Sequence, residues 1–171
     1  MANQKQLDLL SSGKTLWGKW RRAYPDVQAV EPDLHGADLH GVDLHGVDLH
    51  GADLTEANLQ GADLREADLR EADLRNANLL SANLGDAHLQ KARLRWADLR
   101  GATLCHTNLM GADLSKADLR GADLDGALLD KATFAGANVS RGELRRTDLS
   151  KHLEAKGRRP GSVTVPDDHA A

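Results

Sequence analysis

Residues 61–75 read GADLREADLREADLR, which is three copies of one five-residue unit. An apolar side chain occupies every fifth position from Leu34 to Leu149, and it is leucine at all but two of these positions, Phe134 and Val139. A small residue, usually alanine, stands two residues before each of them, and Asp or Asn usually stands directly before. Repetition of this length at a fixed period is typical of a solenoid, in which each unit packs only against its neighbours.

The period of five excludes both a long helix and a flat strand. A helix turns about 100° per residue, so leucines five apart would spread around the cylinder and leave no stripe to bury. In a strand, an odd period turns every second leucine to the opposite face. A short extended segment followed by a corner meets both objections: Ala62 and Leu64 point inward, Asp63 points outward, and Arg65 with Glu66 forms the corner. The number of sides per coil does not follow from this spacing.

The residues around the corner agree with this interpretation. The second corner residue is glycine in ten repeats, and glycine adopts turn dihedrals without steric cost. Asp and Asn side chains commonly accept hydrogen bonds from nearby turn amides. We therefore expect the column of Asp and Asn residues to have a structural role.

The run A-[D/N]-L-x-x over residues 32 to about 151 resembles the signature of the pentapeptide repeat family. The resemblance implies an all-β solenoid, a right-handed quadrilateral β-helix with four repeats per coil. The 24 repeats would then form about six coils, and residues 20 apart would stack in columns. One such column of the structural core would contain Leu34, Leu54, Leu74, Leu94, Leu114 and Phe134.

The sequence predicts three segments: an N-terminal helical cap (1–30), the β-helix (31–151), and a short helical turn with a disordered tail (152–171). The cap is indicated by one apolar stripe at helical spacing, which consists of Leu7, Leu10, Trp17, Trp20 and Tyr24. Pro25 ends this helix, and Gly13 and Gly18 could divide it in two. We expect the segment to cover the open end of the first coil.

The polar side of the expected helix carries Lys14, Lys19, Arg21 and Arg22. We interpret these cations as a solvated helix face, with contact to an acidic partner or a membrane surface as the alternative. At the other end of the β-helix, some members of the family pair two chains, so both monomer and homodimer stay open.

Composition indicates a cytoplasmic protein that does not enter a membrane. The 171 residues include one cysteine, Cys105, so no internal disulfide can form, which suits a reducing compartment. The first residues lack the apolar core of a signal peptide, and no later stretch is apolar enough to span a bilayer.

Two groups of residues invite a metal-binding interpretation. His35, His40, His45 and His50 fall within one coil, but at five-residue spacing they occupy different sides and point outward instead of converging. A second cluster, Cys105 with His106 and His88, lies near one corner on adjacent coils and is no better as a ligand set. No phosphate-binding loop, dinucleotide fingerprint or catalytic set stands out. We therefore predict a non-enzymatic protein with no cofactor, no metal and no catalytic residue.

Departures from the repeat mark a candidate surface for binding a partner. Trp96 occupies a corner position, Arg93 and Arg95 flank it in sequence, and Lys116 stands in the next coil of its column. Exposed tryptophan beside arginine is typical of binding hot spots. Apolar side chains also replace outward polar residues at Leu80, Met110 and Leu128.

These features favour a protein-interaction scaffold that presents a rigid rod to an unknown protein partner. The alternative is a DNA mimic, because some pentapeptide repeat proteins bind DNA gyrase by imitating duplex DNA. We number the four sides by their first repeats, which are residues 32–36, 37–41, 42–46 and 47–51. Only the third side is appreciably acidic, through Asp43, Asp63, Glu66, Asp86, Asp123, Asp125 and Glu143. Duplex DNA carries one charge per about 1.7 Å, so the charge of this rod argues against mimicry. We expect no direct binding to nucleic acid.

Overall fold

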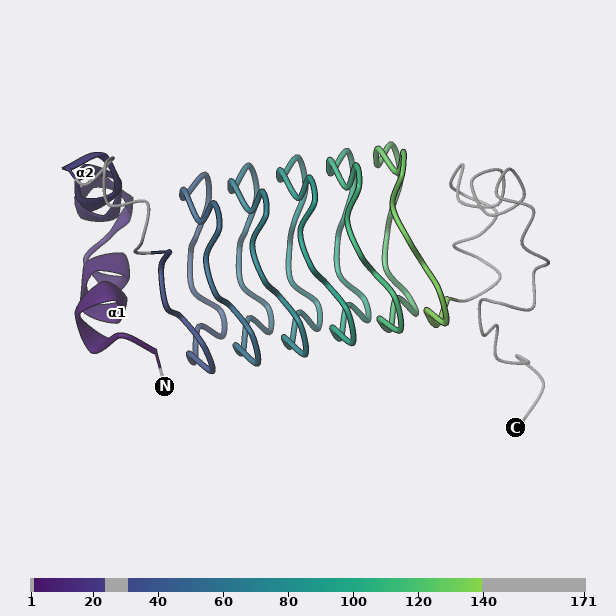
Figure 1. The fold of residues 1–171 in the computed structure, drawn as a ribbon, viewed down its shortest axis with the longest axis horizontal. Coiled ribbons are helices and arrows are strands. Elements are labelled where there is room, and N and C mark those ends of the chain that lie inside the picture. Colours follow the sequence, from purple (N-terminus) through teal and green to yellow (C-terminus); the bar gives the residue numbers. More distant parts are fainter. Residues whose placement is uncertain (1, 24–30, 140–171) are drawn as a thin grey trace.

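The computed structural model describes residues 2–23 and 31–139, which form two short helices and a tube of stacked coils (Figure 1). Helices α1 (Gln4–Ser11) and α2 (Lys14–Ala23) lie at one end of the tube. Tyr24 of the expected apolar stripe lies outside the described residues, as do residues 140–151 of the expected β-helix and the segment 152–171.

Parallel β-bridges join each outward residue to the residue 20 positions later, from Asp33–Asp53 to Asp118–Asn138. Twenty residues therefore complete one coil, which corresponds to four five-residue units. Each side contributes a single bridged residue because the chain enters the next corner two residues later. The described part of the tube, residues 31–139, holds between five and six coils of this length.

Each unit bonds to the next coil through the same backbone groups. The Leu64 N–H donates to the Asn83 carbonyl oxygen at 2.7 Å, and the Glu66 N–H donates to that of Gly85 at 3.1 Å. In return, the Asn83 N–H donates to the Ala62 carbonyl oxygen at 2.9 Å. This pattern repeats along the tube, so backbone groups that face a neighbouring coil are paired as buried groups require.

Every corner is a tight turn with one residue in the left-handed region. The Ala67 N–H donates to the Leu64 carbonyl oxygen at 3.1 Å, and Glu66 between them has a φ of 56°, as type II turns require. All second corner residues from Gly36 to Gly136 have positive φ, and eleven of them are not glycine. Each such residue carries a strain of about 1–2 kcal/mol, so stacking of the coils must outweigh it.

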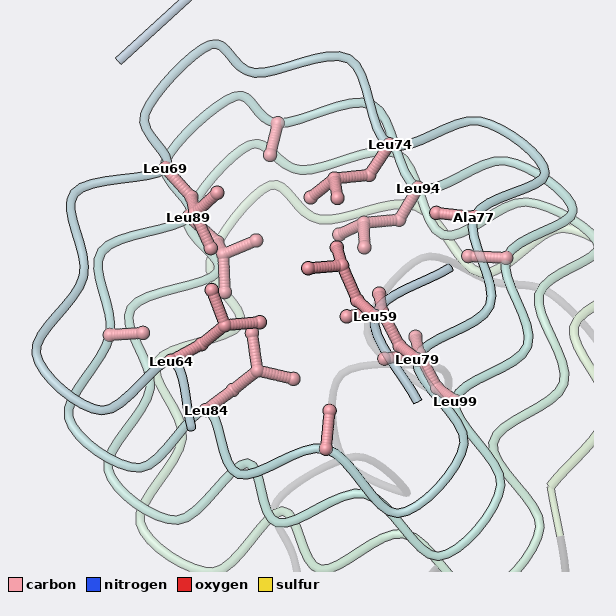
Figure 2. Packing of buried hydrophobic residues seen from close by; sticks show 14 of the residues in the cluster. Leu59, Leu64, Leu69, Leu74, Ala77, Leu79, Leu84, Leu89, Leu94 and Leu99 are labelled. Atoms are coloured by element: carbon pink, nitrogen blue, oxygen red, sulfur yellow. The ribbon is translucent and has the colours of Figure 1, made fainter. Parts of the chain in front are cut away.

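The interior is filled by the alanine and leucine of each unit. Figure 2 shows leucines of four sides pointing into one shared core, among them Leu59, Leu64, Leu69 and Leu74. The column from Leu34 to Phe134 is buried throughout. Thr107 takes the place of an alanine, and its buried hydroxyl donates to the Leu84 carbonyl oxygen at 2.8 Å, which satisfies the one polar group added there.

The two helices follow local signals. Asn3 caps α1, and its Oδ1 accepts from the Lys5 N–H at 3.1 Å. Gly13 separates α1 from α2 with a φ of 100°, a value that favours glycine. Gly18, the other break that the sequence allows, lies inside α2. Within the described ranges, no helix is long and apolar enough to cross a bilayer.

Helix α2 packs on the first coil through its aromatic and basic side chains. Trp17 is fully buried, its ring centre lies 5.0 Å from that of Trp20, and its indole N–H donates to the Asp48 carbonyl oxygen at 2.7 Å. Arg21 donates to the His50 carbonyl oxygen at 2.8 Å and pairs with the Asp48 carboxylate at 3.3 Å.

Assignment of Arg21 to the solvated face of the helix is therefore wrong. Its side chain is only 18% exposed, because the open coil below offers carbonyl oxygens that need donors. Helix α1 meets a similar need. The side chain of Gln6 is buried, and its Oε1 accepts from the Asp33 N–H at 2.7 Å.

Candidate interaction surface

Outward Asp and Asn side chains accept hydrogen bonds from backbone N–H groups of the corner that follows them. The Oδ1 of Asp63 accepts from the Arg65 N–H at 3.2 Å, and the Oδ1 of Asn78 accepts from the Leu80 N–H at 3.1 Å. The same contact recurs on all four sides of the tube. The expected structural role of these residues is thus visible in the hydrogen bonds they make.

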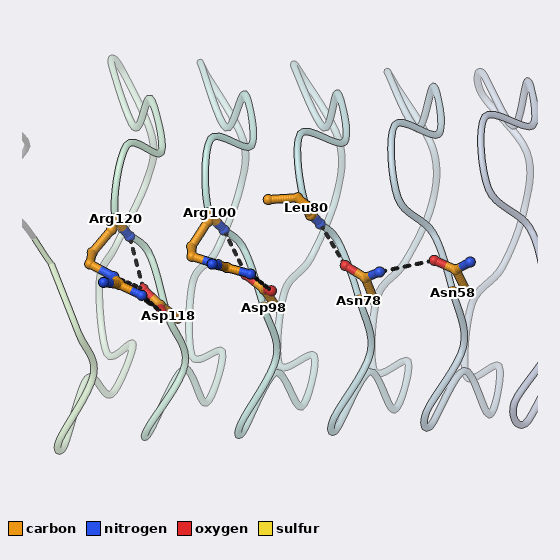
Figure 3. Close-up of polar contacts among 7 residues, drawn as sticks. All are labelled: Asn58, Asn78, Leu80, Asp98, Arg100, Asp118 and Arg120. Atoms are coloured by element: carbon orange, nitrogen blue, oxygen red, sulfur yellow. Dashed lines mark hydrogen bonds and ion pairs between the residues drawn. The ribbon is translucent and has the colours of Figure 1, made fainter.

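Arginine at the first corner position pairs with the aspartate two residues earlier. This occurs in five units, which are Asp63–Arg65, Asp68–Arg70, Asp73–Arg75, Asp98–Arg100 and Asp118–Arg120. Figure 3 shows two of them, where the nitrogen–oxygen distance is 2.7 Å in both. The hydrogen bond from the guanidinium holds the pKa of Asp63 and of Asp98 below its ordinary value.

Where the outward residue is asparagine, the first corner residue is uncharged. Asn78 donates to the Asn58 Oδ1 at 3.0 Å (Figure 3). Asn58 donates in turn to the Asp38 Oδ1 at 2.9 Å, so hydrogen bonds link these side chains from coil to coil. Leu80 follows Asn78, and Met110 follows Asn108 in the same way. A neutral amide needs no cation beside it, so folding chemistry alone accommodates both apolar residues.

The apolar candidates do not form one patch with Trp96. Met110 is 39% exposed and Leu128 is 52% exposed. Leu128 bridges to Asn108, two residues before Met110, so these two residues lie on neighbouring coils of the fourth side. Leu80 is half-buried at the corner that follows the second side, and Trp96 lies at the corner that follows the first side. The seven predicted residues therefore separate into three places on the tube.

Trp96 and Lys116 form a local pair at the corner that follows the first side. The Lys116 Nζ lies 4.5 Å from the centre of the Trp96 ring, within the range of a cation–π contact. Trp96 is 53% exposed although its φ is 65°, a conformation that is costly for a bulky side chain. The ring therefore adds strain at its corner while leaving half of its surface in solvent.

Arg93 and Arg95 depart from the pairing that other corner arginines show. The unit reads Arg93-Leu94-Arg95-Trp96, so arginine stands where the aspartate partner of Arg95 would be. Arg93 reaches the Asp73 carboxylate of the preceding coil at 3.4 Å, and Arg75 already holds that carboxylate. Within residues 2–23 and 31–139, Arg95 makes no ion pair.

The four histidines of the first coil occupy four successive corners. The Nδ1 of His35 lies 2.6 Å from the Thr55 hydroxyl oxygen, and the Nδ1 of His40 lies 2.9 Å from the Asp38 carboxylate. The Nδ1 atoms of His45 and His50 are buried and have no hydrogen-bond partner among the described residues. Among the residues that the structure describes, no three His, Cys, Asp or Glu side chains gather closely enough to hold a metal ion.

Cys105 is half-buried beside Asp123 of the next coil. Burial raises the pKa of its thiol, and the hydrogen bond and negative charge of Asp123 raise it further. A raised pKa lowers the fraction of thiolate, which is the reactive form. The site therefore disfavours nucleophilic chemistry at this sulfur.

Sequence reasoning missed one exposed apolar side chain. Leu16 on α2 is 46% exposed. Around the helix axis it lies about 100° from Trp17 and about 40° from Trp20, at the edge of the stripe that faces the first coil. Because Leu16 stands four residues before Trp20, which is itself a helical spacing, the sequence alone does not separate Leu16 from the stripe of Leu10, Trp17 and Trp20.

Comparisons with known proteins agree with this architecture. The family model described as pentapeptide repeats matches with eight copies in overlapping segments between residues 33 and 150. Comparison with curated proteins finds no match.

Several solved structures are similar to the chain. The pentapeptide repeat protein Rfr23 of the cyanobacterium Cyanothece 51142 is 34% identical over 62% of this chain and 86% of its own, with a TM-score of 0.61. HetL of Nostoc sp. strain PCC 7120, a pentapeptide repeat protein involved in the regulation of heterocyst differentiation, is 37% identical over 63% and 62%, with a TM-score of 0.31. QnrB1, a plasmid-mediated fluoroquinolone resistance protein, is 18% identical over 78% and 81%, with a TM-score of 0.34. The chain belongs to the pentapeptide repeat family, whose members fold as right-handed quadrilateral β-helices.

Proposed function

We propose that the protein is a non-enzymatic scaffold that presents one face of a rigid tube to a protein partner. The observation that carries the proposal is the Trp96 corner, which we define as Arg93, Arg95, Trp96 and Lys116. It places a half-exposed aromatic ring, in contact with a cation, on a corner whose positive φ disfavours a bulky side chain. Tryptophan and arginine are enriched in residues that dominate binding energy.

The build of the tube supports binding more than catalysis. Its outward carboxylates accept hydrogen bonds from turn amides, and several are also paired with arginine. Such carboxylates are ionised and committed to structure, whereas a general acid or base needs a shifted pKa and access to substrate. The hydrogen bonds between coils also fix the surface in advance, which lowers the entropic cost of association.

The second candidate is mimicry of duplex DNA toward gyrase, an activity that the family resemblance suggests. The rod shape and the third side favour it, where Asp43, Glu66, Asp86 and Asp125 are exposed. Arginine offsets five of the outward aspartates, Asp68, Asp73, Asp98 and Asp118 on the other sides and Asp63 on the third. Duplex DNA keeps an unbroken series of phosphates, about one charge per 1.7 Å. We therefore rank mimicry below the scaffold.

The proposal assigns the scaffold to the cytoplasm, where its cysteine would stay reduced. It involves no cofactor. Monomer and homodimer are both compatible with it, because the surface that carries the proposal lies on the wall of the tube and not at its end.

Affinity capture from the native host with the full chain as bait tests the scaffold. The test compares the wild type with Trp96→Asn and Met110→Ser. Asparagine suits the corner, because Asn76 occupies the same position one coil earlier with a φ of 58°. We expect Trp96→Asn to lose a partner that the wild type captures and Met110→Ser to keep it. Failure of the wild type to capture any specific protein would refute the scaffold.

A supercoiling assay with purified gyrase tests the second candidate. We expect no inhibition and no protection against quinolones at micromolar protein. Either effect would reverse the ranking of the two functions.

A further inference from the structure

We propose that the Trp96 corner recognises a segment of the partner protein that carries carboxylates. This inference rests on the proposed scaffold function and gives the chemistry of its partner. It concerns the same four residues, Arg93, Arg95, Trp96 and Lys116, and it follows from the balance of charge around them.

Cations outnumber carboxylates at this corner. Arg75, Arg93, Arg95 and Lys116 carry four positive charges, and Asp73 and Asp113 of the same side carry two negative ones. Asp73 is shared by two arginines, Arg75 at 2.7 Å and Arg93 at 3.4 Å. The corner is therefore locally positive on a chain whose net charge is −4.

Among the contacts of residues 2–23 and 31–139, none gives Arg95 a matched carboxylate. The adjacent Asp113 is engaged by the Ser115 N–H at 2.9 Å and by the Thr133 hydroxyl at 2.9 Å. Arg95 influences Asp113 through charge and helps to hold its pKa low, after the larger effects of burial, which raises it, and these hydrogen bonds. A guanidinium with no bidentate partner is a ready site for a carboxylate, since the fork of N–H groups matches its two oxygens.

Trp96 supplies the apolar part of the contact. Lys116 lies against the ring at 4.5 Å, and the remaining half of the ring is exposed. Arg95 and Trp96 are consecutive residues of one corner, so a segment bound at Arg95 lies within reach of that ring. Arg93 lies two residues before Arg95, and Lys116 lies at the same corner of the next coil. A segment with several Asp or Glu residues can therefore contact more than one of these cations.

A protein segment fits this corner better than duplex nucleic acid. Binding to duplex DNA is dominated by the neutralisation of several phosphates, which requires an extended basic surface. Here the excess of positive charge is confined to one corner of neighbouring coils, which stack at about 4.8 Å.

A photo-crosslinking amino acid in place of Trp96 tests the proposal directly. The full chain carrying it is illuminated in extract of the native host, and the attached peptide is sequenced by mass spectrometry. We expect a segment rich in Asp and Glu. An attached segment without an excess of carboxylates, or attached nucleic acid, would overturn the proposal.

Charge reversal provides a quantitative arm with a matched control. Lys116→Glu and Lys131→Glu change the net charge equally, and both residues occupy exposed second corner positions, with φ of 62° and 61°. We expect Lys116→Glu, and likewise Arg95→Glu, to lower capture of the partner about tenfold at low salt, with Lys131→Glu within about twofold of the wild type.

The outcomes separate this inference from the function on which it rests. Equal capture by Lys116→Glu, Lys131→Glu and the wild type would overturn the acidic-segment proposal and leave the scaffold in place. Absence of any partner for the wild type would remove both.

Discussion

The first coil and the interior coils satisfy the same backbone groups by different means. In the interior, the Asp53 N–H donates to the Pro32 carbonyl oxygen at 2.8 Å, whereas the equivalent Asp33 N–H donates to the side chain of Gln6 at 2.7 Å. The Asp68 carbonyl oxygen accepts from the Leu49 N–H at 2.8 Å, whereas that of Asp48 accepts from the Trp17 indole at 2.7 Å. The helices thus replace bonds that a preceding coil would make.

The difference teaches where individual residues matter. Interior units repeat the same backbone bonds, and each buries one large apolar side chain at the same position. At the N-terminal end, one glutamine, one tryptophan and one arginine each serve a particular backbone group of the first coil. Loss of one of these side chains should therefore open the tube from that end, whereas loss of an interior leucine should weaken the middle.

The largest expected effect is that of Trp17→Ala. It removes a fully buried ring and leaves the Asp48 carbonyl oxygen without its donor, so we expect a loss of about 3–5 kcal/mol. Hydrogen exchange should accelerate first in amides of residues 33–53. Trp17→Phe keeps most of the packing and should lose less. Exchange that accelerates evenly along the tube would contradict a local role for the helices.

The interior counterpart is Leu74→Ala, for which we expect a loss of about 2–5 kcal/mol. Its cavity lies between coils, so faster exchange should centre on residues 54–94 and spread in both directions. Denaturant unfolding followed together with exchange measures both quantities. A response confined to the N-terminal end would show that the coils are not equivalent.

Gln6→Met sharpens the comparison at a single hydrogen bond. Methionine fills similar space but offers the Asp33 N–H no comparable acceptor, so we expect a loss of about 1–3 kcal/mol. Gln4→Met is the control, because Gln4 lies exposed on the same helix. Equal unfolding midpoints for the two variants would show that the bond to Asp33 contributes nothing.

Glu66→Gly should stabilise the protein by about 1 kcal/mol. Glycine relieves the cost of a φ of 56°, although part of the gain is lost to the greater freedom of the unfolded chain. Gly61→Ala, at a corner with a φ of 63°, should act in the opposite direction. Thermal unfolding of the two variants measures the change in stability. A change of the same sign in both variants would contradict the strain at positive φ.

The smallest expected effect is on the dependence of stability on pH. The pKa values of Asp63 and Asp98 are lower in the folded chain, chiefly through hydrogen bonds from Arg65 and Arg100. Their contribution to stability is present above the ordinary carboxyl pKa of about 3.9. It disappears as the pH falls through the lower pKa of the folded chain. The double variant Arg65→Gln and Arg100→Gln should therefore lose less stability between pH 7 and pH 3 than the wild type.

Much of the fold was predictable because the same pattern of small, polar and apolar residues recurs every five positions. The alternation of Ala62, Asp63 and Leu64 predicts which side chains are buried, and the apolar stripe of Leu10, Trp17 and Trp20 predicts helical structure before the repeats. The family resemblance supplied the four-sided coil, which the 20-residue bridges now display. A choice between Gly13 and Gly18 was not possible, since both permit a break.

The candidate surface was harder to predict because it depends on neighbours distant in sequence. In the sequence, Trp96, Leu80 and Met110 share one feature, because each places a large apolar side chain at an outward position where the repeat usually has a polar residue or glycine. The structure shows that Leu80 and Met110 follow a neutral asparagine, whereas Trp96 stands among unbalanced cations. Whether the Trp96 corner binds a partner stays a prediction.

The five-residue period by itself determined which atoms face the interior, because side chains two apart share a face and a corner every five residues resets the alternation. Only the tertiary structure decided how outward charges are balanced. That balance depends on residues 20 apart that stack, such as Arg93 on Asp73 and Lys116 on Trp96, and on the contact of Arg21 with Asp48 across 27 positions. Short-range electrostatics act through space, so their sum at a corner is set only when the coils are assembled.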